Sequence, residues 1–232
     1  MREQRVRMAL TIVDVVDLSL PVKSLNSLGM FPGLPQPMRT TFSTFQDGGP
    51  LTYSWVLVDH TGTHLDSASH FREGGQTIDQ LPVSRCVGHG VVLDFSKQPP
   101  RYSIGKEDIL KAIQAADKNR QVGPGWVLLF YTGYTARANT PQWLDHPELS
   151  EEACKFIVEM NVNAIGFDAP SPDHAPFPAH GILLPKGIGN YENLANLDKL
   201  LGRDFIFVGE PLELVGSTGS PVRAIAMIVK TS

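Results

Sequence analysis

Short runs of β-branched and aromatic residues recur along the chain, with glycine, proline and other turn-forming residues between them. Such runs are typical of β-strands. Helical periodicity is confined to a few segments, so the pattern indicates a strand-rich protein. Strands are predicted at residues 11–16, 39–45, 52–58, 90–95, 126–131, 164–167, 205–208 and 222–229.

Three segments predict helices instead. Within residues 106–118, apolar residues follow the i, i+3, i+4, i+7 spacing of a buried helical stripe, and the same spacing follows Ser150. Ser150 suits an N-cap, because the two glutamates behind it lie where the helix dipole favours negative charge. A shorter helix is predicted for residues 191–201.

The resulting order of elements predicts a mixed α/β fold, rich in strands, with a prominent sheet or a partly closed barrel. No linker or shift in composition divides the sequence, so residues 1–232 are expected to form a single domain. The proline- and glycine-rich residues 31–37 are predicted to be a loop, because proline lacks the backbone donor that helices and sheets require. The order of the strands in the sheet is not predicted.

Composition narrows the class of protein. A net charge of -4 and a pI near 6.0 give no basic surface for nucleic acid and suggest no anionic membrane partner. Asp14 and Asp17 interrupt the apolar run near the start, and no stretch is long enough for a membrane span. Cys86 and Cys154 lie too far apart to suggest a disulfide framework. A cytoplasmic protein with reduced thiols is expected.

One segment concentrates metal-binding chemistry. Residues 60–70 read His-Thr-Gly-Thr-His-Leu-Asp-Ser-Ala-Ser-His and hold three of the seven histidines. Neutral imidazole and carboxylate are the usual ligands of catalytic divalent metals, and Gly62 permits a tight bend between them. His60, His64 and Asp66 are therefore predicted metal ligands. Spacing alone leaves His70 either a further ligand or a free base beside the metal.

A second polar group lies far along the chain and is weak evidence by itself. Asp173 and His174 stand among prolines, which is more typical of a solvated loop, and Glu192 could be a first-turn acid of the predicted helix. A distant histidine and glutamate could nevertheless complete a metal site. The aromatic residues Phe31, Phe71 and Trp143 are candidates for the wall of a pocket.

The histidine-rich segment resembles the H-x-G-T-H-x-D-x-P-x-H signature of the cyclase family of metal-dependent hydrolases, which includes bacterial kynurenine formamidase and isatin hydrolase. The resemblance covers most of the chain, from Asp17-Leu18-Ser19 near its start to Gly219-Ser220-Pro221-Val222-Arg223-Ala224 near its end. Ala68 replaces the proline of the signature. The resemblance implies a swivelling β/β/α fold and a homodimer. It also implies that Asp66 bridges to a second ion held by His180 and Glu192, with His70 as the catalytic acid/base.

The expected function is that of a metal-dependent hydrolase of a small amide C–N bond, with zinc or manganese activating water as the nucleophile. An arylformamidase-like enzyme with an N-formylkynurenine-type substrate is the leading hypothesis. An isatin hydrolase-like enzyme or a lactone hydrolase is an alternative within the same chemistry. A non-catalytic protein that binds a metal or a small molecule is an alternative of another class, and a lyase or isomerase using the same ion is a third.

Overall fold

A computed structural model describes residues 10–116 and 121–231. The start of the chain, with its basic segment, and the end of the predicted helix at Lys118 lie outside these residues. The fold is a mixed α/β domain around one nine-stranded sheet. Its strands, in spatial order, are β1 (Leu10–Asp17), β13 (Ile225–Thr231), β11 (Phe205–Val208), β5 (Val87–Asp94), β7 (Trp126–Tyr131), β9 (Ala164–Phe167), β10 (Gly189–Glu192), β4 (His64–Asp66) and β12 (Gly219–Pro221).

The middle of this sheet is parallel and its flanks are antiparallel. Strands β5, β7, β9 and β10 run parallel, whereas β4 pairs antiparallel with both β10 and β12. The sheet ends in β1 on one side and β12 on the other, so it is open and not closed into a barrel. The prediction of a strand-rich α/β fold is confirmed.

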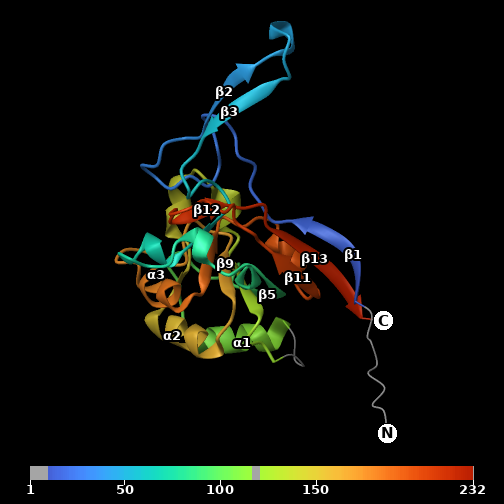
Figure 1. Cartoon of the computed structure of the whole chain (residues 1–232). Coiled ribbons are helices and arrows are strands. Elements are labelled where there is room, and N and C mark those ends of the chain that lie inside the picture. The colour runs from blue at the N-terminus through green and yellow to red at the C-terminus, as the bar shows by residue number, and fades with distance from the viewer. Residues whose placement is uncertain (1–9, 117–120, 232) are drawn as a thin grey trace.

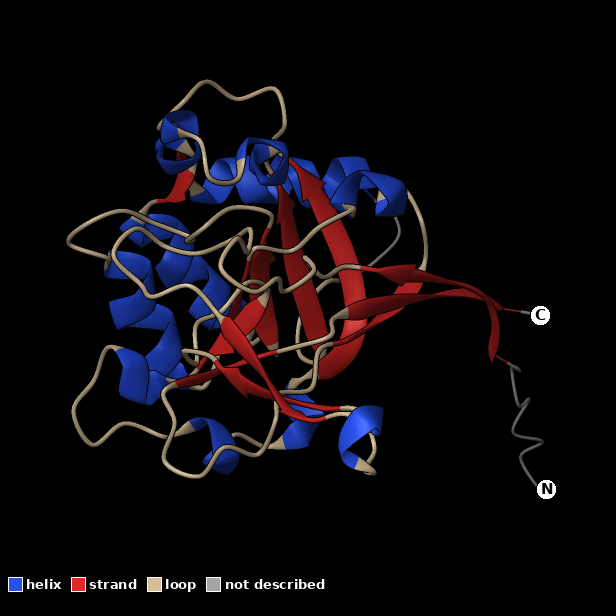
Figure 2. Cartoon of the chain, turned by 90° about the horizontal axis from the view of Figure 1, so that it is seen from above, coloured by secondary structure: helices blue, strands red, loops and turns tan. Residues whose placement is uncertain are grey.

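Helices cover the outside of the sheet. The α-helices are α1 (Lys106–Ala116), α2 (Glu151–Met160) and α3 (Pro178–Leu183). Short 3₁₀ helices lie at Phe45–Asp47, Ala68–His70, Ile78–Gln80, Val83–Arg85, Tyr134–Arg137, Pro141–Asp145, Leu184–Lys186 and Leu197–Leu200. Figure 2 shows the strands through the middle of the molecule, with helices gathered along its periphery. Ser150 caps α2 as predicted, since its hydroxyl accepts a hydrogen bond from the amide of Ala153 at 3.1 Å.

The core has two parts, one on each face of the sheet. Successive side chains of a strand point to opposite faces. In β7, Leu128 and Phe130 accordingly pack in the cluster that includes Ile157 of α2, whereas Val127 and Leu129 pack in the other cluster. The apolar runs that predicted the strands are therefore buried on both sides in the central part of the sheet.

Two small sheets lie outside the main one. Strands β6 (Ser103–Ile104) and β8 (Glu148–Leu149) form a short parallel pair. Strands β2 (Met38–Ser43) and β3 (Thr52–Val56) form an antiparallel hairpin, which projects from the body of the protein at the top of Figure 1. We call residues 38–56 the arm.

The predicted helix at residues 191–201 is wrong. Tyr191 and Glu192 belong to β10, and only Leu197–Leu200 form a 3₁₀ turn. Asn193 and Asn196 adopt left-handed backbone conformations (φ 57° and 58°), which end the strand and exclude a continuous α-helix. The correction affects function, because Glu192 lies on a strand of the central sheet and not in the first turn of a helix. Among the described residues, no helix is long and apolar enough to cross a membrane.

Candidate metal centre

The pairing of β4 with β10 brings together two polar segments that lie far apart in the sequence. In this antiparallel register His64 lies opposite Glu192, and Asp66 lies opposite Asn190. Residues two apart on a strand share a face, so all four side chains point to the same side of the sheet. Asn190 donates hydrogen bonds to Asp66 Oδ2 at 3.0 Å and to Glu192 Oε1 at 2.9 Å. The amide thereby holds two buried carboxylates at a fixed separation.

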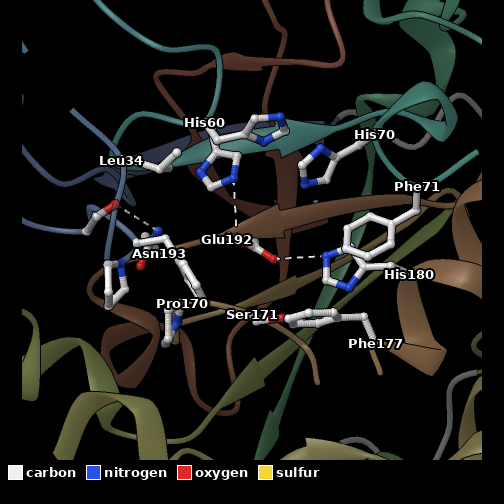
Figure 3. Close-up of a pocket in the computed structure, with 14 residues that line it drawn as sticks. Leu34, His60, His70, Phe71, Pro170, Ser171, Phe177, His180, Glu192 and Asn193 are labelled. Atoms are coloured by element: carbon white, nitrogen blue, oxygen red, sulfur yellow. Dashed lines mark hydrogen bonds and ion pairs between the residues drawn. The ribbon is translucent and has the colours of Figure 1, made fainter. Parts of the chain in front are cut away.

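His180 of α3 completes this group from above the sheet. Its Nε2 lies 3.3 Å from Glu192 Oε1 and 3.5 Å from Asp66 Oδ2. His64 Nε2 lies 3.4 Å from Glu192 Oε2 and 3.3 Å from Asp66 Oδ1. The four side chains converge on one point, and Figure 3 shows Glu192 reaching toward His180 across the pocket. The structure thus brings His180 and Glu192 to the histidine-rich segment.

His60 also lies beside Asp66, at the carboxylate oxygen that His64 approaches, and His70 lies next to His60. His60 Nδ1 is 2.8 Å from Asp66 Oδ1, and the left-handed Gly62 (φ 61°) turns the chain between His60 and β4. The ring of His70 stacks on the ring of His60, with centroids 3.9 Å apart and an interplanar angle of 29°. His60, Asp66 and His70 can hold a cation with ligand atoms within 4.8 Å of one another, and so can His64, Asp66 and Glu192.

Aromatic and apolar side chains wall the pocket above these groups. Phe71 stacks on the ring of His180 with centroids 4.3 Å apart, and Phe177 meets Phe71 edge-on at 5.5 Å. The loop at residues 29–34 forms the opposite wall and contributes Phe31. Phe31 and Phe71 therefore line the pocket as predicted. Trp143 does not, because it is buried in the core cluster beneath the sheet.

Comparison with known proteins gives the relationship. The family model described as "Putative cyclase" matches residues 16–174. The chain belongs to this family. The isatin hydrolase of Roseibium aggregatum is 30% identical over 213 residues, which cover 81% of this chain and 80% of that protein. The kynurenine formamidase of Bacillus thuringiensis (strain Al Hakam) is 30% identical over 216 residues, which cover 90% of this chain and 95% of that protein.

The fold comparison agrees. A solved structure described as a "Potential Metal-Dependent Hydrolase With Cyclase Activity" superposes with a TM-score of 0.74 at 25% identity, covering 94% of this chain and 98% of that one. These relationships place this cyclase-family chain among metal-dependent hydrolases that act on amide C–N bonds. The predicted resemblance to this family is confirmed.

The hydrogen bonds behind the histidines show that the site suits a metal. His64 Nδ1 lies 2.9 Å from the Gly62 carbonyl, and His180 Nδ1 lies 2.8 Å from Asp173 Oδ1. Carbonyl and carboxylate oxygens only accept, so each Nδ1 carries a hydrogen and Nε2 is the ring nitrogen that faces the carboxylates. Either a proton on Nε2 or a cation between Nε2 and the carboxylate oxygens satisfies this contact. Metal-binding histidines typically donate the hydrogen of their other ring nitrogen to a carbonyl or carboxylate oxygen in this way.

The electrostatics of the site favour positive charge. Burial alone would lower the pKa of His64, but the charges of Asp66 and Glu192 outweigh it and raise that pKa to about 9. Burial raises the pKa of Glu192, and the neighbouring charge of Asp66 raises it further. Burial also opposes ionisation of Asp66, yet the histidines around it hold its pKa well below the usual value. Two buried carboxylates therefore attract either protons or a divalent cation.

His70 differs from the other histidines of the site. Burial lowers its pKa to about 4. Within the part of the chain that the structure describes, no hydrogen bond fixes its ring, which contacts other rings only by stacking or edge-on packing. A neutral imidazole without an orienting partner can turn toward a substrate more readily than a fixed ligand can.

Reasoning from the sequence missed Asp173 and Asn190. Asp173 was expected in a solvated loop, but it is buried and holds His180. Asn190 had no signal at all, because its role depends on the register of β10 and β4. Asp168, at the end of β9, lies apart from the site and accepts hydrogen bonds from Thr132 and Gly133. Burial raises its pKa to about 6.

Proposed function

We propose that the protein hydrolyses a small aryl amide, with an N-formyl aryl amine of the N-formylkynurenine type as the leading substrate. One observation carries this proposal: two imidazoles and two carboxylates are buried side by side, and His64, His180 and Glu192 of this group line a pocket with aromatic walls. The kynurenine formamidase relative supports the formamide. The isatin hydrolase relative makes a cyclic amide of the isatin type the second candidate, with a lactone as a further ester-like variant.

Each residue proposed to bind metal directs a ring nitrogen or a carboxylate oxygen toward the proposed metal site. They would hold one or two divalent ions, and zinc and manganese suit mixed imidazole and carboxylate ligation. When bound, such an ion lowers the pKa of water from 15.7 to about 7 and polarises a carbonyl. Asp66 belongs to both candidate groups, the one with His60 and the one with His64 and Glu192, and is proposed to bridge two ions. The proposed ligands are His60, His64, Asp66, His180 and Glu192.

His70 is proposed as the acid/base. Its ring stands at the mouth of the pocket beside Phe71, and hydrogen bonds do not tie it to the protein within the described residues. It takes a proton from the attacking water and returns a proton to the leaving nitrogen, so that amide and water give a carboxylic acid and an amine. Phe71 and Phe177 hold the aryl group against the pocket wall and exclude bulk water from the reacting carbonyl.

The decisive test is turnover by protein of verified metal content. We expect hydrolysis of N-formylkynurenine or a related N-formyl aryl amine that exceeds hydrolysis of isatin and of aromatic lactones. A preference for isatin would transfer the assignment to the second candidate. Turnover of no member of the panel by metal-loaded protein would contradict the proposal and favour a binding function.

We further propose that residues 1–232 act as one hydrolase domain in a homodimer, with the arm as the contact between copies. A two-stranded hairpin is marginally stable alone in water, and this one exposes apolar side chains on both faces. Self-complementary surfaces of this kind are typical of two-fold dimers. A cytoplasmic location is also proposed, supported by two buried, unpaired cysteines. The exposed apolar residues of the arm are Met38, Phe42, Phe45, Leu51, Tyr53, Trp55 and Val56.

The arm is tested by the mass of the particle in solution. Phe42→Ser and Trp55→Ser remove exposed apolar area without touching the core. We expect light scattering to report a dimer for the native protein and monomers for the double variant at micromolar concentration. Val215→Ser is the control, because Val215 is more exposed than Phe42 and Trp55 but lies off the arm. A native monomer would contradict the proposed dimer and leave the hydrolase proposal intact.

A further inference from the structure

The segment at residues 217–220, which leads into β12, packs directly against His60, with Thr218 at the Nε2 edge of the ring. Thr218 Oγ1 lies 2.9 Å from His60 Nε2 and donates a hydrogen bond to Asp59 Oδ2 at 2.9 Å. The sequence matched Gly219 and Ser220 of this segment to the family but gave Thr218 no role. We infer that Thr218 and Asp59 position His60 so that it binds metal through Nδ1, whereas His64 and His180 bind through Nε2. The inference rests on the proposed metal site.

Counting hydrogens fixes the state of His60. A carboxylate oxygen only accepts, so the single hydrogen of the Thr218 hydroxyl is committed to Asp59. The hydroxyl oxygen can then only accept from His60, and the hydrogen of the neutral imidazole must be on Nε2. Nδ1 is left bare, and it faces Asp66 Oδ1 at 2.8 Å. Two acceptors at that distance require a cation or a shared proton.

The segment is held firmly enough to impose this state. Asp59 Oδ2 also accepts hydrogen bonds from the Thr218 amide at 3.1 Å and from Ser217 Oγ at 2.9 Å. The Thr218 carbonyl in turn accepts from the amide of Ser67, at 2.9 Å, and from its hydroxyl, at 2.8 Å. The donors and acceptors around Thr218 all have partners. Turning its hydroxyl away from Asp59 would therefore break a hydrogen bond.

Close packing adds a steric constraint. A Cβ atom built on Gly219 would lie 2.7 Å from Cε1 of His60 and 2.9 Å from the Leu65 carbonyl oxygen. Only glycine lets the segment approach the ring this closely. The backbone at Gly219 and the hydroxyl of Thr218 therefore both contact the His60 ring and limit its movement beside Asp66. Thr218 and Asp59 are positioning residues and are not themselves catalytic.

The first experiment measures zinc affinity by competition with a chromophoric chelator. Thr218→Val keeps the shape of the side chain and removes the hydroxyl, and loss of such orienting partners typically weakens metal binding by about 10- to 100-fold. We expect that loss in Thr218→Val and recovery to near the native value in Thr218→Ser. Thr135→Val is the control, because the Thr135 hydroxyl bonds two carbonyls and no proposed ligand. Unchanged affinity in Thr218→Val would overturn the inference.

A second variant keeps the test informative if Thr218→Val folds poorly. Asp59→Ala removes the acceptor, which frees the hydroxyl to donate to Nε2 and so favours a hydrogen on Nδ1. We expect weakened zinc binding in Asp59→Ala as well, with thermal unfolding and circular dichroism verifying the fold. Native zinc affinity in folded Asp59→Ala would contradict the role of Asp59.

The second experiment reads the ring nitrogens directly. Nuclear magnetic resonance of ¹⁵N-histidine-labelled, zinc-loaded protein distinguishes a metal-bound Nδ1 from a metal-bound Nε2. We expect one histidine bound through Nδ1 with hydrogen on Nε2, and at least one with the opposite assignment. Zinc-bound histidines that all bind through Nε2 would overturn this inference alone. Absence of zinc binding by the native protein would overturn the proposed metal site together with it.

Discussion

Asp173 fixes the orientation of His180: its Oδ1 lies 2.8 Å from His180 Nδ1, and both side chains are buried. Asp173 Oδ2 meanwhile accepts from the amides of Ala179, at 2.6 Å, and His180, at 3.3 Å. The carboxylate therefore accepts from backbone amides in the first turn of α3 and also keeps a hydrogen on Nδ1 of the His180 imidazole.

Asp173→Asn should weaken metal binding whichever way the new amide turns. With its oxygen toward His180, the NH₂ group meets two backbone donors; with its NH₂ toward His180, the imidazole must reverse its hydrogen. We expect zinc affinity to fall about 10- to 100-fold and stability to fall by about 1–3 kcal/mol. Chelator competition and denaturant unfolding measure the two effects. Glu148→Gln, which alters another acceptor of the same region, should keep native zinc affinity.

His70→Gln should separate catalysis from metal binding. If His70 moves protons, kcat should fall by about 10²- to 10⁴-fold while zinc content and zinc affinity stay at native values. Elemental analysis and steady-state kinetics on the same sample provide the measurement. His89→Gln, at an exposed position on β5, is the control. Loss of an ion in His70→Gln would instead make His70 a ligand, as its distance to His60 and Asp66 also permits.

The sequence was most informative where the chemistry is local. Three of the proposed site residues lie within seven positions, and Gly62 marks the bend between them. The family resemblance, and not periodicity, predicted that His180 and Glu192 lie at the metal site. Local pattern placed Glu192 in a helix, because the apolar spacing after it resembles a helical stripe. Pairing of β10 between β9 and β4 overrides that local preference.

Other parts of the site depend on burial, which a single sequence does not display. Asp173 among prolines resembles a surface loop until the packing beneath α3 is known. Trp143 is similar: an aromatic residue near polar neighbours could face a pocket or the core, and only the tertiary structure places it in the core. Thr218 was undetectable because its partners, Asp59 and His60, are distant in sequence.

Phe71→Ala should weaken recognition of aryl substrates. The ring stacks on His180 and stays half-exposed toward the pocket, where an aryl group can pack on it. Aromatic pairs contribute about 0.5–1.5 kcal/mol beyond area burial, so KM for an N-formyl aryl amine should rise roughly two- to tenfold. KM for an N-formyl alkyl amine should change less. Leu212→Ala, exposed and outside the pocket, serves as the control, and an equal change for both substrates would contradict an aryl subsite.

His146 should make the fold sensitive to acid. Burial, and after it the charge of the neighbouring His174, lower its pKa to about 3. A neutral imidazole thus stabilises the folded state fully above the unfolded pKa of about 6.5. That stability is lost as pH falls toward 3, by up to about 1.4 kcal/mol per pH unit.

Denaturant unfolding between pH 4.5 and 7.5 tests this dependence. His146→Gln keeps a donor for the Pro147 carbonyl, which His146 Nδ1 approaches at 2.8 Å, and it cannot be protonated. We expect a shallower loss of stability with acid in His146→Gln than in the native protein. Equal slopes for His146→Gln and native protein would show that His146 does not titrate with folding.

The central claim is that side chains from β4, β10 and α3 surround a catalytic metal. Anomalous diffraction at the zinc edge, from crystals of zinc-loaded protein, tests it most directly. The predicted result is a strong peak between His64, Asp66, His180 and Glu192, with any second peak beside His60. Zinc peaks only elsewhere on the molecule, or none at saturating zinc, would contradict the claim.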